Sequence, residues 1–407
     1  MAKTFKRCWT KPNGAKREAW CVDYSDGAGN RHRPQFKTRK AADKFRVKVE
    51  GQLSDGIYRP DADKVTVKEV CEAFIENCEG RMRRNERMTR KMLTVYRGHV
   101  NNHILHSDHG VGQSKLSQVT ARRVGDFRDA LRNVGVTVPT TRKILATFHA
   151  VLEYAISQDW VATNAVHRVR VIGPRDEGSK KIVPPSKVDM RLIIEAAKNR
   201  AEAKIAEVRG MEKSRRSRAQ RLFAADISDM SLKIVFAAAT GLRAGEQWAV
   251  RWRDVDLDAG ELTVTERVDC YGEFGPPKSA AGVRAVPLSS ALVQELKKWQ
   301  LRSQFSGDND FVFSSRNGEH TCHDNLIKRH FRPLLEEAKV SGINWHSLRH
   351  YAVSTWIEAG LAPKTVQTFA GHSSLQVTMD RYGHLFPSDD HKAAMDAIAG
   401  ELMGCVP

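Results

Sequence analysis

The hydrophobic pattern of the first sixty residues changes from alternation to a spacing of four. Trp20, Val22 and Tyr24 alternate with polar residues and predict a strand. The runs "FKRCWT" and "RHRPQF" predict two more, with turns at Pro12–Gly14 and Gly27–Asn30. After them, Thr38 can cap a helix with one apolar side, formed by Ala41, Phe45, Val49 and Leu53. We therefore expect a three-stranded sheet and one helix over residues 1–60.

Residues 65–170 have the periodicity of helices. Thr66 and Glu69 form a capping-box pattern ahead of an apolar face, and Thr120 precedes another such face. A further helix is expected to begin at Thr140 or Thr141. The sequence predicts a small helical bundle here.

Residues 171–187 combine two glycines and three prolines with many charges, which is typical of a linker. Residues 188–407 mix helical periods with two strand-like runs, "ELTVTERVD" and "VRAVPLS". Within them, residues 198–221 are rich in Ala, Glu, Lys and Arg and are expected to be a charged, solvated helical insertion or to be partly disordered. The expected fold class is multidomain, mainly α with small β-sheets.

The charge of the chain favours a polyanionic partner. Its 407 residues include 66 Lys and Arg against 48 Asp and Glu, a formal net charge of +18. The basic residues occur in every region rather than on one amphipathic helix, which favours nucleic acid over a membrane surface. The residues expected to contact DNA are Arg39, Lys40, Arg81, Arg83, Arg84, Arg87, Arg90 and Lys91.

The composition also sets the expected compartment. The seven cysteines are scattered and contain no C-x-x-C pair, so we expect reduced thiols in a cytoplasm. The N-terminus lacks an apolar signal core, and no run of about 18 apolar residues occurs, so neither export nor a membrane partner is expected.

Two patterns raise the question of a metal. His99 and His103 have a spacing that a zinc site can use, but no acidic or cysteine ligand completes an ordered set with them or with His106 and His109. Asp254 and Asp256 could form a two-metal pair but are better explained as turn residues before a strand. We expect no metal site and no cofactor.

Tyr382, in "MDRYGHL", becomes a candidate nucleophile when other motifs are considered with it. Attack of a phenol on a phosphodiester requires cations around the phosphate oxygens, a proton donor for the leaving oxygen and an acceptor for the phenol proton. The C-terminal region offers such residues in separated motifs: Arg243 in "TGLRAGE", Lys278 in "PPKSAAG", His346 and Arg349 in "WHSLRH", and His372 in "GHSS".

In their order and spacing, these motifs resemble those of the tyrosine recombinases, specifically the bacteriophage integrase branch. The resemblance implies that Tyr382 forms a 3′-phosphotyrosyl bond to DNA and that Arg243 and Arg349 clamp the scissile phosphate. Lys278 would be the general acid. His346 would accept a proton, and His372 would donate a hydrogen bond to phosphate. Glu246 is expected to orient the arginine and His350 to pack or support the pocket.

The resemblance extends to the other regions of the chain. It implies an arm-type DNA-binding domain at 1–60, a core-binding domain at 65–170 and a catalytic domain at 188–407. The implied partners are double-stranded DNA attachment sites of core and arm types, a homotetramer on DNA, a host DNA-bending protein and an excisionase. The implied location is the nucleoid of a host bacterium. Met395, Ile398 and Leu402 share one side of an expected helix that could pack on its own domain or on a neighbouring protomer.

Two other functions remain open at this stage. A type IB topoisomerase uses the same tyrosine chemistry without exchanging strands between sites, although the arm-like unit argues against it. A non-catalytic DNA-binding regulator with a recombinase fold would have no need of the whole set of pocket residues. If the chain is instead an integrase, its reaction is expected to be independent of metal and to integrate or excise mobile DNA.

Overall fold

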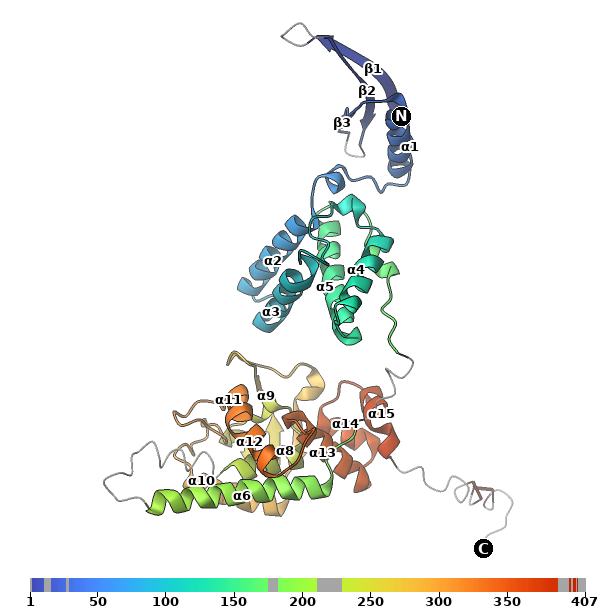
Figure 1. The fold of residues 1–407 in the computed structure, drawn as a ribbon. Helices are drawn as coiled ribbons and strands as arrows, with labels where there is room; N and C mark the ends of the chain where they lie inside the picture. Colours follow the sequence, from blue (N-terminus) through green and yellow to red (C-terminus); the bar gives the residue numbers. More distant parts are fainter. Residues whose placement is uncertain are drawn as a thin grey trace. The chain divides into compact units, whose positions relative to one another are not determined.

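The computed structural model describes residues 2–10, 16–26, 29–174, 182–210 and 229–386, and Met395, Asp396, Ile398, Ala399 and Glu401. The chain forms two units, residues 1–178 and 179–407 (Figure 1). Their boundary falls inside the stretch expected to be a linker. None of the described helices has the length and apolar character needed to cross a membrane.

Several expected features lie outside the described residues. They are the Pro12–Gly14 turn, part of the Gly27–Asn30 turn, residues 211–221, Leu402 and Cys405. The other six cysteines are free thiols.

The first unit begins with an antiparallel sheet and one helix. Strands β1 (Lys3–Thr10) and β2 (Lys16–Ser25) pair along their length. The expected third strand consists of two short pieces, β3 (Arg31–His32) and β4 (Gln35–Phe36), which both pair with β2. Pro34 separates them and has no N–H to donate to a ladder. Helix α1 (Arg39–Ser54) then covers the sheet, with Val22, Tyr24, Ala42 and Val49 in the shared core.

The rest of this unit is a helical bundle with its own hydrophobic core. Its helices are α2 (Val67–Arg83), α3 (Arg90–His99), α4 (Ala121–Asn133) and α5 (Val138–Ser157). Its short turns are η1 (Pro60–Asp63), the π-helical η2 (Val100–Ile104), η3 (Leu116–Gln118) and η4 (Ala165–Arg168). The caps expected at Thr66 and Thr120 are both present, and Thr66 and Glu69 form the full capping box.

The predicted start of α5 was wrong by one turn. The N-cap is Thr137, whose Oγ1 accepts a hydrogen bond from the backbone N–H of Thr140 at 3.4 Å. Pro139 lies in the first turn, where its missing N–H costs nothing because that donor has no helical partner. Thr141 is an interior helical residue whose hydroxyl donates to the carbonyl of Thr137 at 3.0 Å.

The second unit surrounds a small sheet with helices. Strands β5 (Val255–Asp256), β6 (Glu261–Val264) and β9 (Arg284–Pro287) form an antiparallel sheet in that order, and β7 (Arg267–Val268) with β8 (Phe274–Gly275) forms a hairpin. The α-helices are α6 (Lys187–Gly210), α8 (Met230–Thr240), α9 (Ala244–Gln247), α10 (Ser290–Arg302), α11 (His323–Leu326), α12 (Arg332–Glu337), α13 (Trp345–Glu358), α14 (Pro363–Ala370) and α15 (Leu375–Tyr382). Short turns are η5 (Trp252–Asp254), η6 (Ala280–Gly282), the π-helical η7 (Ile327–Phe331) and η8 (Gly383–Leu385).

Gln247 and Trp248, which follow directly after "GLRAGE", lie in the core of this unit. Trp248 is 1% exposed and packs near Trp345. The buried amide of Gln247 donates to the carbonyl of Lys233 at 3.0 Å and accepts from the indole N–H of Trp345 at 3.1 Å. Because both ends of the amide are paired, the polar side chain is accommodated without an unsatisfied group.

The charged segment expected at residues 198–221 begins inside α6. The alanines Ala197 and Ala201 are buried, and Ala197 belongs to the main core of the unit. Lys204, on the same helix, pairs with Glu207 at 2.6 Å. The described part of the segment is therefore a helix that packs through small residues and carries its charges elsewhere.

Candidate active site

Three arginines bind the C-terminal end of α14. The carbonyl groups of residues 369, 370 and 371 accept hydrogen bonds from Arg284 at 2.7 Å, Arg349 at 2.5 Å and Arg243 at 2.9 Å, respectively. The last carbonyls of a helix have no helical donor and carry a partial negative charge, so cations are stabilised there. One helix end thus positions three guanidinium groups that come from distant parts of the sequence.

Glu246 joins two of these arginines. Its carboxylate accepts from the Arg243 side chain at 2.7 Å and from Arg284 at 2.9 Å, and it also caps the Arg243 backbone N–H at 3.0 Å. Burial raises the pKa of Glu246, but the attraction of Arg284 and Arg243 outweighs it and the pKa is lowered overall. The carboxylate is therefore ionised at neutral pH and fixes both guanidinium groups.

Arg284 was not expected at the site from the sequence. This residue is 6% exposed and lies on β9, on the same side of the strand as Val286. The run "VRAVP" alternates as a strand does and places this arginine on the inward side. A buried charge requires a partner, so this pattern could have indicated that Arg284 belongs to a buried ion pair.

Arg349 links two helix ends. It extends from α13, and besides the end of α14 it donates to the carbonyl of Gly241 at 2.6 Å. Gly241 ends α8 with a φ of 60°, the left-handed conformation that glycine commonly adopts at the end of a helix. Burial, followed by the charge of Arg243, lowers the pKa of Arg349 to about 9, so the guanidinium stays charged at neutral pH.

Tyr382 is buried beside this group of arginines. Its side chain is 1% exposed, and its hydroxyl lies 2.6 Å from Nδ1 of His350. Burial raises the pKa of Tyr382, while Arg349 and Arg381 oppose that increase. His350, expected only to pack or support, is therefore the histidine in contact with the phenol, and His346 contacts His350 edge-on with ring centroids 4.7 Å apart.

His372 forms the other side of the tyrosine ring. It is 4% exposed, its Nδ1 lies 2.9 Å from the hydroxyl of Thr378, and its ring is nearly parallel to that of Tyr382 at 6.2 Å. Burial and then nearby arginines, Arg349 first, lower its pKa to about 3. The pKa values of His346 and His350 are lowered to about 4, in each case chiefly by burial and then by neighbouring positive groups. All three rings are neutral at pH 7.

Lys278 is not part of this contact network. It is exposed in the loop between β8 and β9, and no hydrogen bond or ion pair connects it to the other candidates within the described residues. Its role as the general acid stays a prediction. His346, at the start of α13, keeps part of its surface in solvent, although neighbouring groups desolvate its ring enough to lower its pKa.

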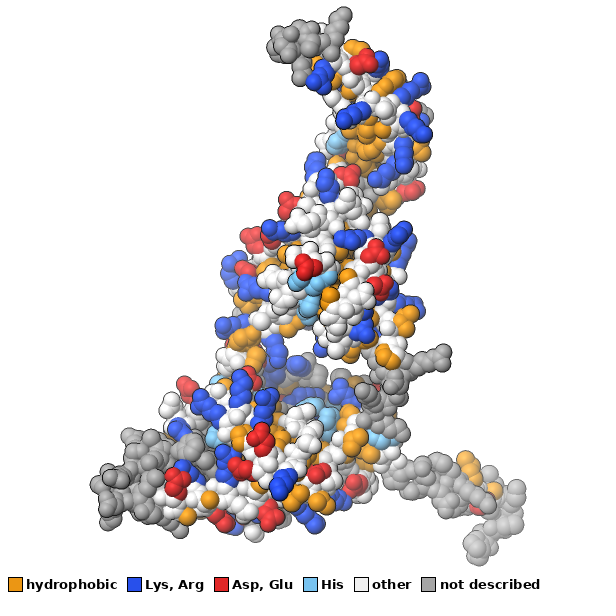
Figure 2. Space-filling model, in the orientation of Figure 1, with side chains coloured by type: hydrophobic (Ala, Val, Ile, Leu, Met, Phe, Trp, Pro, Cys, Tyr) orange, Lys and Arg blue, Asp and Glu red, His pale blue; other side chains and the backbone are white. Residues whose placement is uncertain are grey.

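The basic residues expected to contact DNA lie on exposed parts of the first unit. Arg81 and Arg84 pair with Glu86, while Arg39 stacks over the Trp20 ring with its guanidinium carbon 5.5 Å from the centroid. Figure 2 shows Lys and Arg side chains on the visible face of both units. Their contact with DNA stays a prediction.

The two sequence patterns considered for metal take other roles. Nδ1 of His99 lies 2.7 Å from the hydroxyl of Thr147, and in the described part of the chain the run from His99 to His109 does not bring three ligand atoms together. Asp256 accepts the backbone N–H groups of Asp258 and Ala259 in a turn, as expected.

The stability of this pocket is expected to depend on pH. An unfolded histidine titrates near pH 6.5, whereas His350 and His372 titrate at about 4 and 3 in the fold. Between these values the unfolded chain binds more protons, so stability is full above pH 6.5 and is lost as the pH falls towards 4. At about 1.4 kcal/mol per pKa unit, the loss amounts to a few kcal/mol. Thermal unfolding measured between pH 7 and pH 4.5 gives this loss of stability. The free energy of unfolding should depend less steeply on pH in His372→Gln.

Gly371→Ala should disturb the arginine cluster. Gly371 has a φ of 63°, and an added Cβ would lie 2.8 Å from the Arg284 guanidinium. Gly360 is a matched control, since it has a φ of 81° but open space around the Cβ position. Both changes should cost about 1–2 kcal/mol through the backbone. Only Gly371→Ala should also impair the pocket, as measured by the rate of DNA strand cleavage; equal rates in the two variants would contradict the packing argument.

Comparisons with known proteins agree with this geometry. Residues 212–388 match the model of the phage integrase family. The chain is 25% identical over 396 residues to a XerC-like tyrosine recombinase from Caldanaerobacter subterraneus, covering 90% of this chain and 92% of the relative. It is 22% identical to the ICEBs1 integrase of Bacillus subtilis, over 89% of this chain and 91% of that one.

Residues 212–388 therefore belong to the phage integrase family, and the relatives that match nearly the whole chain are a tyrosine recombinase and an integrase. The fold of the chain resembles that of a Tn1549 transposon integrase in complex with DNA, with a TM-score of 0.58 and 15% identity over 81% of this chain and 98% of that one. It also resembles a lambda integrase dimer bound to a COC′ core site, with a TM-score of 0.55 and 17% identity over 94% and 97% of the two chains. The expected fold class is confirmed.

Proposed function

We propose that this tyrosine recombinase cuts and rejoins DNA strands at specific attachment sites, through a 3′-phosphotyrosyl bond at Tyr382, to integrate and excise mobile DNA. The observation that carries the proposal is the pocket itself. A buried phenol with a histidine at its hydroxyl lies among arginines that are anchored on a helix end.

In this proposal, Arg243 and Arg349 bind the non-bridging oxygens of the scissile phosphate. A guanidinium matches two phosphate oxygens and keeps its charge. Glu246 and Arg284 act as positioning residues, because Glu246 pairs with Arg243 and is itself held by Arg284. Preorganised cations stabilise the charge of the pentacoordinate transition state without rearranging during the reaction.

The bond changes balance without a cofactor. The Tyr382 oxygen attacks phosphorus, its proton passes to a histidine, and the bond from phosphorus to the 5′ oxygen breaks. Lys278 supplies the proton to that leaving oxygen once its loop closes over the phosphate. Attack by a 5′-hydroxyl on the phosphotyrosine reverses the steps and joins the strand, so the energy of the original bond is retained.

His350 and His346 provide the route for the phenol proton. In the free protein, burial and positive neighbours keep the pKa of His350 at about 4. A bound phosphodiester anion would offset the nearby positive charges and raise that pKa, which strengthens the base when the substrate arrives. His372 would donate to a phosphate oxygen and hold the ring of Tyr382.

The proposed partners are DNA and further copies of the chain. We assign arm-type DNA binding to residues 1–60, core-site binding to residues 65–170 and catalysis to residues 188–407. Because the two DNA-binding modules are linked, binding of one module to its site raises the effective concentration of the other module near its own site. A homotetramer on DNA would carry out strand exchange, with a host DNA-bending protein and an excisionase as helpers, in the bacterial nucleoid. The exposed Met395 and Ile398 are candidates for contact with a neighbouring protomer.

The test is covalent trapping on DNA in EDTA. The substrate is a duplex carrying the junction of the mobile element that encodes the chain, nicked so that the short 5′-hydroxyl fragment dissociates after cleavage. A protein–DNA adduct that survives denaturant is the expected result, and its absence on that junction would overturn the proposal. Supercoil relaxation with no preference for the junction would instead indicate a topoisomerase.

A further inference from the structure

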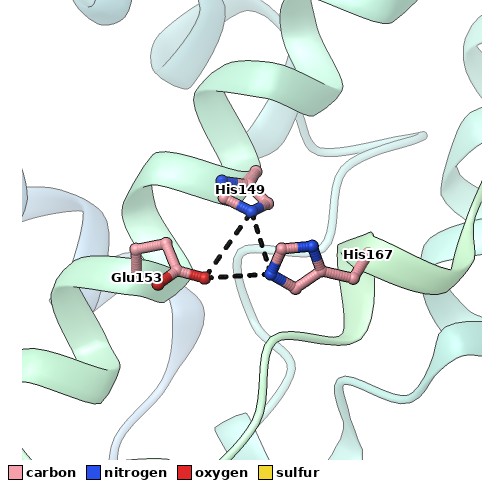
Figure 3. Close-up of side chains that lie close together, drawn as sticks. All are labelled: His149, Glu153 and His167. Atoms are coloured by element: carbon pink, nitrogen blue, oxygen red, sulfur yellow. Dashed lines mark hydrogen bonds and ion pairs between the residues drawn. The ribbon is translucent and has the colours of Figure 1, made fainter.

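A second group of chemically active side chains lies in the helical bundle of the first unit. His149 and Glu153 are one turn apart on α5, and His167 comes from the η4 turn (Figure 3). Nε2 of His149 lies 3.2 Å from Nε2 of His167, and one carboxylate oxygen of Glu153 lies 3.5 Å from the first ring nitrogen and 3.3 Å from the second. All three atoms therefore face one common point.

These three separations match the edges of a metal tetrahedron. Nitrogen and oxygen ligands lie about 2.0–2.1 Å from zinc, so two ligands of a tetrahedral ion are about 3.3 Å apart. When both rings carry their proton on Nδ1, three lone pairs converge on the same point. A cation stabilises that arrangement, whereas without one the lone pairs repel each other.

We propose that His149, Glu153 and His167 form a zinc site, with water as the fourth ligand. Two imidazoles and a carboxylate suit a borderline ion such as Zn²⁺ better than Mg²⁺ or Ca²⁺, which prefer all-oxygen sites. The residues are half-buried or exposed, so the ion can enter directly from solvent. The sequence offered little signal, because His167 lies outside the helix that carries the other two ligands.

Asn164 already orients the ligands. Its amide nitrogen donates to the Glu153 oxygen at 2.7 Å and to the backbone carbonyl of His149 at 3.1 Å, while its oxygen caps the Val166 N–H at 3.1 Å. Ligating carboxylates in metal sites are themselves hydrogen-bonded in this way. Asn164 and the buried Val166 hold η4 against α5 through contacts of their own, so they preorganise the three ligands.

The site would fasten the segment that leads out of the first unit. Directly after η4, the carbonyls of Arg170 and Val171 accept hydrogen bonds from Arg128 at 2.9 Å and Arg142 at 3.1 Å. Arg142 is exposed and Arg128 is half-buried, so these two hydrogen bonds alone hold the segment weakly. A metal bond between α5 and His167 would fix the start of this segment much more firmly. The proposed catalytic residues belong to the other unit, so this role is structural and distinct from strand cleavage.

The test uses the full-length protein without a histidine tag, stripped with a chelator and dialysed. Zn²⁺ is titrated against a chromophoric chelator, and Co²⁺ is added separately to read the coordination geometry from its visible spectrum. We expect one zinc ion per chain and the intense bands of tetrahedral cobalt. The double variant His149→Gln/His167→Gln should weaken binding by more than the about 10- to 100-fold loss that removal of a supporting residue causes. His106→Gln, in the other histidine group of the bundle, is the matched control.

Hydrogen exchange gives an independent readout. Zinc should slow exchange of the amides of Val166, in η4, and of Val169, directly after it, in the native protein. It should have no such effect in the double variant. Absence of stoichiometric zinc, equal affinity in the double variant, or loss of binding in His106→Gln would each overturn the proposal. DNA cleavage in EDTA is expected to persist, so the outcome is separate from that of the recombinase test.

Discussion

Tyr382→Phe is expected to abolish the covalent protein–DNA adduct while leaving DNA affinity within about twofold. The change removes a single oxygen, so no phosphotyrosyl bond can form. The ring remains buried with the same shape, and the fold loses only the hydrogen bond to His350, which is worth about 1 kcal/mol. Adduct formation on denaturing gels and DNA binding in an electrophoretic shift assay measure the two effects.

Tyr351→Phe is the control for this prediction. Tyr351 lies on α13 in the same unit, but no candidate residue depends on its hydroxyl. It should form adduct at the wild-type rate. An adduct that persists in Tyr382→Phe, or that disappears equally in Tyr351→Phe, would assign the nucleophile elsewhere.

Glu246→Gln should have the second largest effect, on both stability and catalysis. The carboxylate is 2% exposed and is shared by Arg243 and Arg284, so its loss leaves two guanidinium groups without their buried counter-charge. Breaking a buried ion pair costs about 3–5 kcal/mol. Because Arg243 also loses its fixed position, cleavage should fall about 100-fold or more.

Asp258→Asn provides the comparison for Glu246→Gln. Asp258 pairs with Lys297 at 3.0 Å but is 95% exposed at its side chain, and exposed pairs contribute about 1 kcal/mol or less. Chemical denaturation and single-turnover cleavage should therefore separate the two variants clearly. Similar losses of stability and of cleavage rate in the two variants would contradict the assigned role of Glu246.

Local patterns predicted the elements of this fold well because each depends on neighbouring residues. The capping box at Thr66 and the N-cap at Thr120 follow from side-chain and backbone preferences within one turn. The start of α5 was misplaced because three threonines can each cap a helix, and Pro139 decided which one does. The third strand was predicted as one piece, although a proline interrupts its hydrogen bonds.

The site was predictable in its members but not in its contacts. The order of the motifs predicted that Arg243, Arg349 and Tyr382 belong to one site. The hydrogen bonds between the arginines and the end of α14 arise only in the tertiary fold, so no local pattern predicts them. His346 was expected to accept a proton, and this role stays a prediction. In the structure it is His350, one helical turn further along α13, that lies 2.6 Å from the phenol oxygen. Arg284 was missed because a single charge in a strand carries no motif.

Mapping the DNA-linked peptide tests the central claim most directly. Wild-type protein trapped on the nicked junction in EDTA is digested with protease and nuclease, and the modified peptide is sequenced by mass spectrometry. The account predicts one nucleotide-bearing peptide, modified at the Tyr382 oxygen through a 3′-phosphate. Modification of any other residue, or a linkage through a 5′-phosphate, would contradict it.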